Sequence, residues 1–422
     1  MGNYIRPRGT LDLFDADAQI FSYIIAKANG VAKKYNYKPI YTPTFEQTSL
    51  FARSTGETSD IVTKEMYTFK DKGDREITLR PEGTAGVIRA IIENKLYAIN
   101  DLPVKYYYSG SFFRYERPQV GRYREFSQFG VEIVGSNSYL DDCELILFIS
   151  SLLKELNIND YTIRINTFGD LTCRNNYRDS VKEFFKPHIA SLCEDCQKRF
   201  NNNPLRILDC KIDKEYLQTL KIPQTQDSLD EKNKNEFTKI KEILKDNDIP
   251  YKEDPYLVRG LDYYTGLIFE VDITLKDGKV LTIGGGGRYS NLVKELGGPD
   301  LNCVGFAVGI NRIALYLKEL YCVDTYENKV DYYIMPFMEE ATTMASSIAK
   351  KLREKNYVVV VENSKKSVGS MFKYASKNHF SKAIMIGEDE LKENKLKIKD
   401  LNTQEQTYIT LEELLKDGKT NG

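Results

Sequence analysis

Arginines cluster in one segment of the chain, Phe112–Gly135, whose sequence is FFRYERPQVGRYREFSQFGVEIVG. They alternate with aromatic residues, an arrangement that an ordinary charged surface hairpin does not require. The planar guanidinium group binds phosphate oxygens through paired hydrogen bonds, and an aromatic ring offers an adenine a surface for stacking. Because alternate residues of a strand share a face, we expect Arg114 and either Phe126 or Gln128 to face one cleft. The segment therefore indicates a nucleotide site, with a plain charged hairpin as the alternative.

Two further observations limit how a nucleotide is held. The run Gly284–Gly287 is followed by Arg288 and Tyr289 rather than by the Lys-Ser/Thr pair of a phosphate-binding loop. The only histidines, His188 and His379, are isolated from each other, which excludes kinase catalytic loops and metal sites built on several histidines. If this chain uses ATP, arginines must bind it.

The cysteines raise the question of a metal site. Four of the seven fall close together, with the spacing C-x19-C-x2-C-x13-C. A zinc site with four thiolate ligands is conceivable from this pattern, but the first and last spacings are not diagnostic, and buried or exposed thiols are the simpler interpretation. No metal is assigned, and zinc is considered unlikely. The ligands of that alternative would be Cys173, Cys193, Cys196 and Cys210, with Cys173 the weakest.

Length and composition indicate a globular chain. The 422 residues predict two to three domains, and 41% hydrophobic residues suffice for buried cores. No apolar run approaches the ~20 residues that span a bilayer. Met1–Thr10 is not followed by the apolar stretch of a signal peptide. We therefore expect a cytoplasmic protein that does not associate with membranes.

The elements that position the arginine segment follow from apolar spacing. Asp15 or Asp17 is expected to cap a helix that runs to about Tyr35. Tyr37–Glu46 (YKPIYTPTFE) predicts a stiff, proline-punctuated strand, and this helix and strand together form a plausible dimerisation element. Further strands are expected at Val104–Phe113, Ser127–Gly135, Tyr161–Thr167, Leu267–Ile273 and Lys279–Ile283, with helices over Leu140–Leu156 and in the later part of Gly305–Tyr321.

Two regions differ from this pattern. The polar stretch Leu171–Pro255 predicts a small inserted helical domain. After Lys329, strands and helices alternate, which is typical of a separate small α/β domain with a partly parallel sheet. Between Lys350 and Lys382, nine basic residues stand against two acids, and such a stretch attracts a phosphate backbone. A solvated helix face and a dimer-stabilising appendage are the alternatives.

Five motifs, in order along nearly the whole chain, resemble those of the histidyl-tRNA synthetases, a family of class II aminoacyl-tRNA synthetases. The class motifs are TPTFE around Pro43, Arg114 followed by Glu116-Arg117-Pro118, and Gly305–Ile313 (GFAVGINRI). The segments that narrow the resemblance to the histidine-specific family are Leu79–Thr84 (LRPEGT) and Val258–Tyr264 (VRGLDYY).

The resemblance implies a reaction. The carboxylate of histidine attacks the α-phosphate of ATP, giving histidyl-adenylate and pyrophosphate, and the histidyl group then passes to the 3′ end of tRNA(His). Because the nucleophile is already ionised, catalysis consists of holding two anions together and neutralising charge at phosphorus, for which arginines and Mg²⁺ are suited. Arg259 and Arg114 are the implied catalytic residues.

The resemblance also implies binding roles. Glu132 would accept the imidazole N–H, while the Tyr263 or Tyr264 hydroxyl supplies the other partner. As alternatives, Glu82 could cap a helix that begins near Thr84, and the two tyrosines could be packing residues. The implied ATP-binding residues are Arg114, Glu116, Arg122, Phe126 and Arg312. The implied histidine-binding residues are Glu82, Thr84, Arg114, Gln128, Glu132, Arg259, Tyr263 and Tyr264.

The implied fold is α+β, with a class II antiparallel-sheet catalytic domain, an inserted helical domain and a C-terminal α/β anticodon-binding domain. Its expected boundaries are 1–170 and 256–325 for the two catalytic parts, 171–255 for the insertion and 330–422 for the anticodon-binding domain. The implied partners are ATP with Mg²⁺, L-histidine, tRNA(His) and a second copy of the chain.

Some features depart from the family pattern or leave rivals open. Asn311 stands where an acid commonly precedes the motif 3 arginine, and Val120 and Ser127 occupy positions often held by a basic residue and a histidine. One rival is a non-catalytic, synthetase-like regulatory subunit of histidine biosynthesis. Another is a synthetase for a different amino acid, such as threonine or proline.

Overall fold

The computed structural model describes residues 4–55, 59, 61–261, 263–320, 329–364, 366–393 and 395–416. Asp262 of the VRGLDYY segment, Lys365 of the basic stretch, and the last residues of the expected C-terminal domain lie outside these ranges. The chain divides into two compact units, residues 1–325 and 326–422. No helix in the described ranges is long and apolar enough to cross a membrane.

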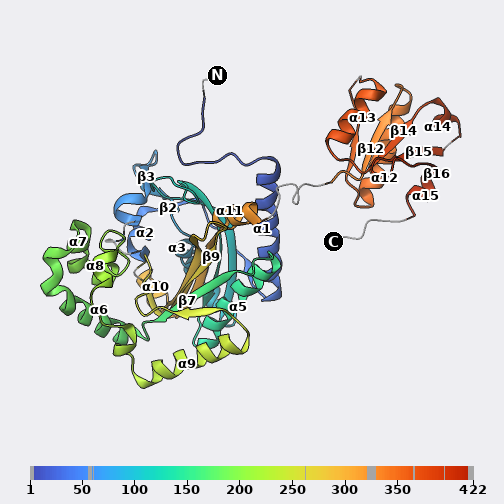
Figure 1. Ribbon diagram of the computed structural model, residues 1–422. Coiled ribbons are helices and arrows are strands. Elements are labelled where there is room, and N and C mark those ends of the chain that lie inside the picture. Colours follow the sequence, from blue (N-terminus) through green and yellow to red (C-terminus); the bar gives the residue numbers. More distant parts are fainter. Residues whose placement is uncertain are drawn as a thin grey trace. The chain divides into compact units, whose positions relative to one another are not determined.

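The first unit is built on an eight-stranded sheet (Figure 1). Only its edge pairs, β1 with β5 and β7 with β8, are parallel, and all other neighbours are antiparallel. The expected antiparallel catalytic sheet is therefore confirmed. In spatial order the strands are β1 (Lys38–Pro39), β5 (Val104–Phe113), β6 (Glu125–Val134), β11 (Cys303–Gly309), β10 (Val280–Tyr289), β9 (Tyr264–Thr274), β7 (Tyr161–Thr167) and β8 (Tyr251–Glu253).

The hairpin β9–β10 is longer than its alternation predicts. The glycine run Gly284–Gly287 continues β10 between β9 and β11 instead of ending it. The backbones approach so closely that a Cβ on Gly286 would lie 2.1 Å from the carbonyl oxygen of Gly305. Glycine is therefore required there for strand packing. Because glycine has a low strand propensity, the sequence did not predict that the strand continues through this run.

Helices α1 (Asp15–Lys34), α5 (Tyr139–Glu155) and α11 (Ile310–Leu320) pack together against the sheet. Helix α1 buries Ile20, Ile24 and Val31, as their spacing predicts. Figure 1 shows α1 and α11 on one side of the sheet and α6, α7 and α8 of the insertion on the other, whereas α9 packs on α5.

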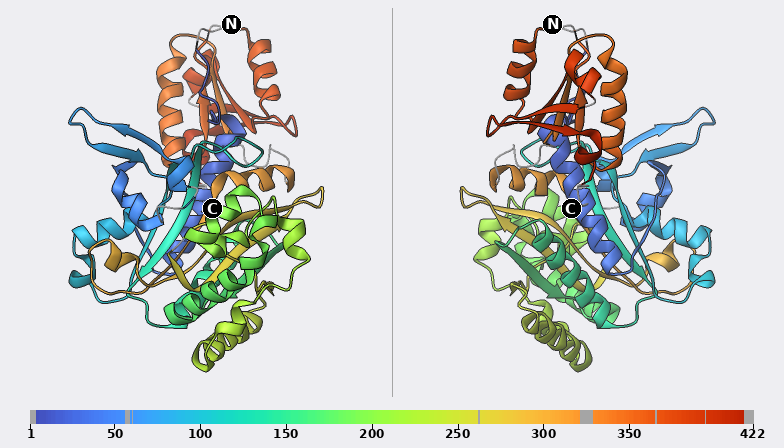
Figure 2. Two further views of the ribbon diagram at one scale, coloured as in Figure 1. Left: turned by 90° about the vertical axis from the view of Figure 1, so that its left-hand side faces the viewer. Right: turned by 90° about the vertical axis from the view of Figure 1, so that its right-hand side faces the viewer.

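The expected strand over 37–46 is interrupted. Its first part is β1, and its last residues begin β2 (Phe45–Gln47) in a separate three-stranded sheet of order β2-β4-β3. Pro39 is still paired in β1, whereas Pro43, which has no N–H to donate, lies in the break between the two strands. The hairpin of β3 (Tyr67–Lys70) and β4 (Glu76–Leu79) projects from the unit (blue in Figure 2). Around this sheet lie α2 (Thr48–Thr55), η1 (Ile61–Glu65), α3 (Thr84–Glu93), α4 (Leu96–Ile99) and α10 (Leu292–Glu295).

The insertion is helical, as expected, and lies in the chain between β7 and β8. Its buried side chains Tyr177, Phe185 and Ile207 belong to one core with residues of β5, β6 and β9. Its elements are α6 (Leu171–Phe185), η2 (Lys186–Ser191), α7 (Glu194–Asn202), η3 (Pro204–Ile207), α8 (Lys214–Gln218), η4 (Thr225–Ser228) and α9 (Glu231–Asp246).

The second unit is an α/β fold whose five-stranded sheet has the order β13-β12-β14-β15-β16. Strand β12 is parallel to both of its neighbours and the other pairs are antiparallel, so the partly parallel sheet is confirmed. Helix α14 was not expected from the sequence. The elements are β12 (Tyr332–Pro336), α12 (Ala341–Glu354), β13 (Val359–Val361), α13 (Val368–Lys377), β14 (Lys382–Ile386), α14 (Glu388–Glu393), β15 (Lys395–Asp400), β16 (Gln406–Thr410) and α15 (Leu411–Leu414).

The basic stretch is divided within this unit. Helix α12 packs in one apolar core through Ile348 and Leu352, and α13 packs in the other through Met371 and Ala375. The exposed lysines and arginines of the two helices therefore belong to different faces of the sheet rather than to one continuous surface.

Candidate active site

A cavity of about 660 Å³ lies in the first unit and is bordered by β6, β9, β10, β11 and the insertion. Of the residues assigned from the sequence to ATP or histidine, all but Glu132 line it. These are Glu82, Thr84, Arg114, Glu116, Arg122, Phe126, Gln128, Arg259, Tyr263, Tyr264 and Arg312. The fold thus brings together residues that are more than 200 positions apart in the sequence.

Three guanidinium groups, those of Arg114, Arg122 and Arg312, share one part of the cavity. The Glu116 carboxylate lies between two of them, 3.9 Å from Nη1 of Arg114 and 3.4 Å from Nη1 of Arg122. Arg312 donates to the carbonyl oxygens of Gly121 and Thr282. Burial, followed by the charge of Arg122, lowers the pKa of Arg312. Crowded cations of this kind are stabilised by an anion, and a polyphosphate has the matching charge.

Arg114 and Phe126 face the same cleft, as strand alternation predicts. The guanidinium carbon of Arg114 lies 5.3 Å from the centre of the Phe126 ring, and its Nε donates to the carbonyl oxygen of Pro81 at 2.9 Å. The pairing of β5 with β6 places Phe112 opposite Phe126. The ring is therefore held at the cavity wall beside a cation.

Arg259 enters the cavity over the glycine run. Its Nη1 lies 2.6 Å from Oε1 of Glu270, and a Cβ on Gly285 would lie 2.7 Å from that same nitrogen. Within the described part of the chain, the buried Nε of Arg259 and the buried Oε1 of Gln128 have no hydrogen-bond partner. Buried polar groups are nearly always paired, so these two atoms indicate where a polar ligand binds.

Glu132 lies behind the cavity wall. Its side chain is buried, Oε1 accepts from Oγ1 of Thr84 at 2.7 Å, and Oε2 accepts from the Tyr289 hydroxyl at 2.5 Å. Burial raises the pKa of Glu132 to about 8. Thr84 and Tyr289 both line the cavity, so in this arrangement they lie between the cavity and Glu132, which the resemblance predicts to accept directly from the imidazole.

Glu82 lines the cavity and also caps a helix. Its carboxylate accepts the backbone N–H groups of Thr84 at 2.7 Å and Ala85 at 2.8 Å, at the start of α3. Burial raises the pKa of Glu82. The structure therefore confirms the alternative in which Glu82 caps a helix. Each of its two carboxylate oxygens accepts one backbone N–H group of α3.

Tyrosines form an aromatic wall. The ring centres of Tyr263 and Tyr264 are 4.7 Å apart, and Tyr263 is 5.2 Å from Tyr289. Tyr289, Tyr108 and Glu270 line the cavity but were not assigned from the sequence. The sequence could have indicated Glu270 as a site residue, because an acid within the apolar strand β9 needs a cationic partner. The sequence indicates Tyr289 only weakly, through its position close to the glycine run Gly284–Gly287.

The departures from the family pattern have local explanations in two cases. Oδ1 of Asn311 accepts the backbone N–H of Ser127 at 2.7 Å, which joins α11 to β6. An amide oxygen serves this purpose as well as a carboxylate. Val120 lies in the connection between β5 and β6 with 77% of its surface exposed, so its side chain contributes little to packing.

The cysteine grouping expected from spacing needs a correction. Cys193, Cys196 and Cys210 gather with Asp213, whereas Cys173 lies near Asp170 and Asp230 in a different place. Asp170 and Asp230 are N-cap residues of α6 and α9, and Cys173 lies in the first turn of α6. Cys173 is therefore not the fourth member of the cluster.

A largely antiparallel sheet that carries an arginine-lined cavity is the arrangement expected of the catalytic domain of a class II aminoacyl-tRNA synthetase. The histidyl-tRNA synthetase family model matches residues 9–313, and an anticodon-binding domain model matches residues 331–418. The chain belongs to the histidyl-tRNA synthetase family and is therefore a ligase.

Similar proteins cover nearly its whole length. A histidine–tRNA ligase of Thermosipho melanesiensis is 44% identical over 407 residues, 96% of each chain. One from Staphylococcus saprophyticus is 41% identical over 411 residues, 97% of this chain and 98% of its own. The crystal structure of apo S. aureus histidyl-tRNA synthetase matches with a TM-score of 0.82 and 36% identity, covering 98% of this chain and 99% of that one. The regulatory-subunit alternative is not favoured, because the curated relatives at this identity are ligases.

Proposed function

We propose that the cavity activates histidine with ATP and that the chain transfers the histidyl group to tRNA(His). The observation that carries this proposal is the convergence of Arg114, Arg259 and Arg312 on one cavity beside a tyrosine wall. The three arginines come from distant segments, and their convergence requires the whole fold of the first unit.

Adenylate formation needs charge neutralisation more than proton transfer. A histidine carboxylate oxygen bonds to the α-phosphorus, and the bond from phosphorus to the pyrophosphate oxygen breaks. In our proposal Arg114 and Arg259 bind the α-phosphate from opposite sides, and Arg259 also binds the substrate carboxylate through its unpaired Nε. Arg122 and Arg312 bind the distal phosphates, while Phe126 stacks on adenine. Preorganised cations in a partly buried site stabilise such a transition state strongly.

Magnesium would complete the nucleotide site. Mg²⁺ prefers oxygen ligands and is commonly bound by one or two carboxylates together with phosphate oxygens. Glu116 fits this role, because it lies at the cavity wall between Arg114 and Arg122, where the phosphates are proposed to bind. A bound Mg²⁺ would offset further charge on the distal phosphates.

Histidine selection is proposed to rest on the tyrosine wall and the polar groups behind it. Tyr263 and Tyr264 contact the imidazole, and the unpaired Oε1 of Gln128 accepts from the α-ammonium group. Glu132 orients the Tyr289 hydroxyl toward the imidazole. When that hydroxyl turns to the ligand, Glu132 itself accepts from the imidazole N–H. A buried site built for both imidazole nitrogens rejects amino acids that lack them.

The remaining assignments concern partners. The second unit is proposed to bind the anticodon of tRNA(His), in keeping with its match to anticodon-binding domains. A homodimer is proposed from the motif 1 region, where Tyr41 is 86% exposed and Phe45 is 53% exposed. Large apolar side chains so exposed in neighbouring positions favour an interface. The cytoplasm, where aminoacylated tRNA is used, is the proposed location.

Amino-acid-dependent exchange of pyrophosphate into ATP tests this proposal. The full chain should support exchange with histidine and with none of the other standard amino acids. Arg259→Ala should abolish it while circular dichroism shows that the fold is kept. Exchange with a different amino acid, or full activity of Arg259→Ala, would overturn the assignment.

A further inference from the structure

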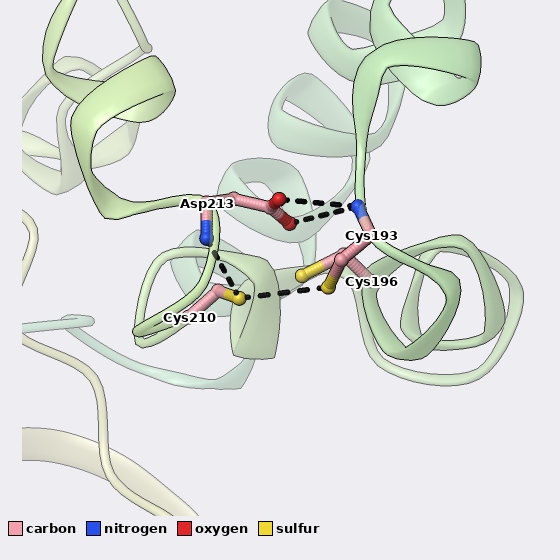
Figure 3. Close-up of side chains that lie close together, drawn as sticks. All are labelled: Cys193, Cys196, Cys210 and Asp213. Carbon is pink, nitrogen blue, oxygen red and sulfur yellow. Dashed lines mark hydrogen bonds between the residues drawn. The ribbon is translucent and has the colours of Figure 1, made fainter.

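Four side chains of the insertion converge on one another (Figure 3), and none of them lines the active-site cavity itself. Cys193 is the N-cap residue of α7 and Cys196 lies in its first turn. Cys210 and Asp213 come from the loop that joins η3 to α8. One ligand atom from each of the four residues lies within 4.8 Å of the others, and Sγ of Cys193 is 3.8 Å from Sγ of Cys210.

These distances match a metal site better than a disulfide. Thiolates bound tetrahedrally to zinc, with Zn–S distances of about 2.3 Å, lie roughly 3.8 Å apart. A disulfide would require about 2.05 Å. Two ligands separated by two residues at a helix start, with two more from a following loop, are a common zinc arrangement.

The carboxylate of Asp213 gives an independent indication of a cation. Asp213 is 7% exposed, yet it forms no ion pair with a lysine or arginine in the described ranges. Its two oxygens each accept the backbone N–H of Cys193 at 3.1 Å. A buried carboxylate that is not neutralised by a side chain is costly unless it is paired or binds a metal. Here the sulfur atoms of three cysteines lie within 4.8 Å of a carboxylate oxygen.

We propose that Cys193, Cys196, Cys210 and Asp213 bind one zinc ion through three sulfur atoms and one carboxylate oxygen. Sulfur donors select zinc over magnesium and calcium, which prefer oxygen. Four protein ligands leave no open position, so the ion is structural rather than catalytic. Binding releases the thiol protons to solvent and changes no oxidation state.

The site would fix one wall of the active-site cavity. The loop that supplies Cys210 and Asp213 also carries Asp209 and Lys211, which line the cavity. Just before it, Nη1 of Arg206 donates to the carbonyl oxygen of Gly260, next to Arg259, at 2.9 Å. Joining this loop to α7 through a metal therefore holds the insertion against the segment that carries Arg259. This effect on catalysis rests on the proposed function, whereas zinc binding does not.

The proposal is tested by measuring the zinc content of the full chain, purified without chelators, by elemental mass spectrometry. We expect an equimolar amount of zinc, and Cys196→Ser and Cys210→Ser should fall well below it. Cys173→Ser is the matched control, because Cys173 is buried in the same insertion but lies outside the cluster, and it should retain the metal. Replacing zinc with Co²⁺ should give the absorption of tetrahedral thiolate ligation.

Asp213→Asn separates metal binding from folding, because the amide keeps the shape and an oxygen that accepts from Cys193. It should lose zinc to a chelator faster than the unmodified chain and shift the Co²⁺ spectrum. Sub-stoichiometric zinc in the unmodified chain, equal metal content in all variants, or a disulfide among the three cysteines would overturn the proposal. If zinc is present and histidine-dependent exchange is absent, the metal site stands and the proposed function fails.

Discussion

Nη1 of Arg259 lies 2.6 Å from Oε1 of Glu270, and the other carboxylate oxygen of Glu270 lies 2.5 Å from Nη2 of Arg164. Arg259 therefore does not enter the cavity as a free side chain. Its position is set by a carboxylate on β9 that a second arginine holds in place.

Glu270→Gln should mainly affect catalysis. The amide keeps the size of the side chain but removes the charge that orients Arg259, so kcat of the exchange reaction should fall by roughly 10- to 100-fold with a smaller change in KM for histidine. Glu242→Gln, on the exposed side of α9, is the matched control. An unchanged kcat would show that Arg259 is positioned without Glu270.

Phe126→Ala should weaken ATP binding selectively. Stacking of a base on an aromatic ring contributes about 1–3 kcal/mol, so KM for ATP should rise by roughly 5- to 150-fold while KM for histidine changes little. Phe126→Tyr keeps the ring and should restore binding. Equal increases in both KM values would argue that the substitution disturbs the hairpin instead of an adenine contact.

Gly305→Ala should displace the buried side chain of Glu132 and lower the stability of the first unit. Gly305 lies opposite Glu132 on neighbouring strands, and a Cβ there would lie 1.8 Å from the Glu132 carboxylate oxygen. Overpacking of this kind costs about 1–3 kcal/mol, which differential scanning calorimetry would detect as a lower Tm. Gly30→Ala, where a Cβ meets nothing within 4 Å on α1, should not lower Tm. A Gly305→Ala chain with native Tm and activity would contradict the packing described here.

Stability should depend on the protonation of Glu132. Burial raises its pKa from 4.5 to about 8, so the folded chain binds a proton that the unfolded chain has lost between these pH values. The contribution of Glu132 to stability is therefore fully present below about pH 4.5 and is lost as pH rises through 8. Glu132→Gln resembles the protonated acid, and the Tm difference, variant minus unmodified chain, should increase from pH 5 to pH 9. A difference that stays constant with pH would show that Glu132 is ionised in the folded chain.

Tyr289→Phe should raise KM for histidine. Tyr289 lines the cavity, and the substitution removes its hydroxyl, which donates to Glu132 at 2.5 Å. Losing a hydrogen bond to a buried polar group costs about 1–3 kcal/mol, so we expect an increase of roughly 5- to 150-fold with KM for ATP unchanged. Tyr408→Phe, on β16 of the second unit, is a control for loss of a hydroxyl. An unchanged KM for histidine would remove Tyr289 from the recognition site.

Local patterns in the sequence predicted the parts of the site that depend on neighbouring residues. Strand alternation placed Arg114 and Phe126 on one face, and the alternation of strands and helices after Lys329 predicted the second unit. The motif order supplied the rest of the assigned residues, and these assignments stay predictions until they are tested by substitution.

What the sequence did not show depends on contacts between distant segments. The hydrogen bond from Tyr289 to Glu132 and the ion pair of Arg259 with Glu270 require the register of β6, β11, β10 and β9. Asp213 was missed because a search among cysteines alone returns Cys173 as the fourth member. The prolines at 39 and 43 predict a stiff segment, but the division of the expected strand between two sheets follows from the pairing of β1 with β5 and of β2 with β4.

The insertion leaves the sheet after β7 and returns in β8, which pairs alongside it. A region tethered at two adjacent points can change in length and sequence during evolution while the catalytic scaffold persists. Asp209 and Lys211 thus place part of this insertion at the border of the cavity. A molecule that extends through the cavity toward Lys211 would contact the insertion as well as the catalytic sheet.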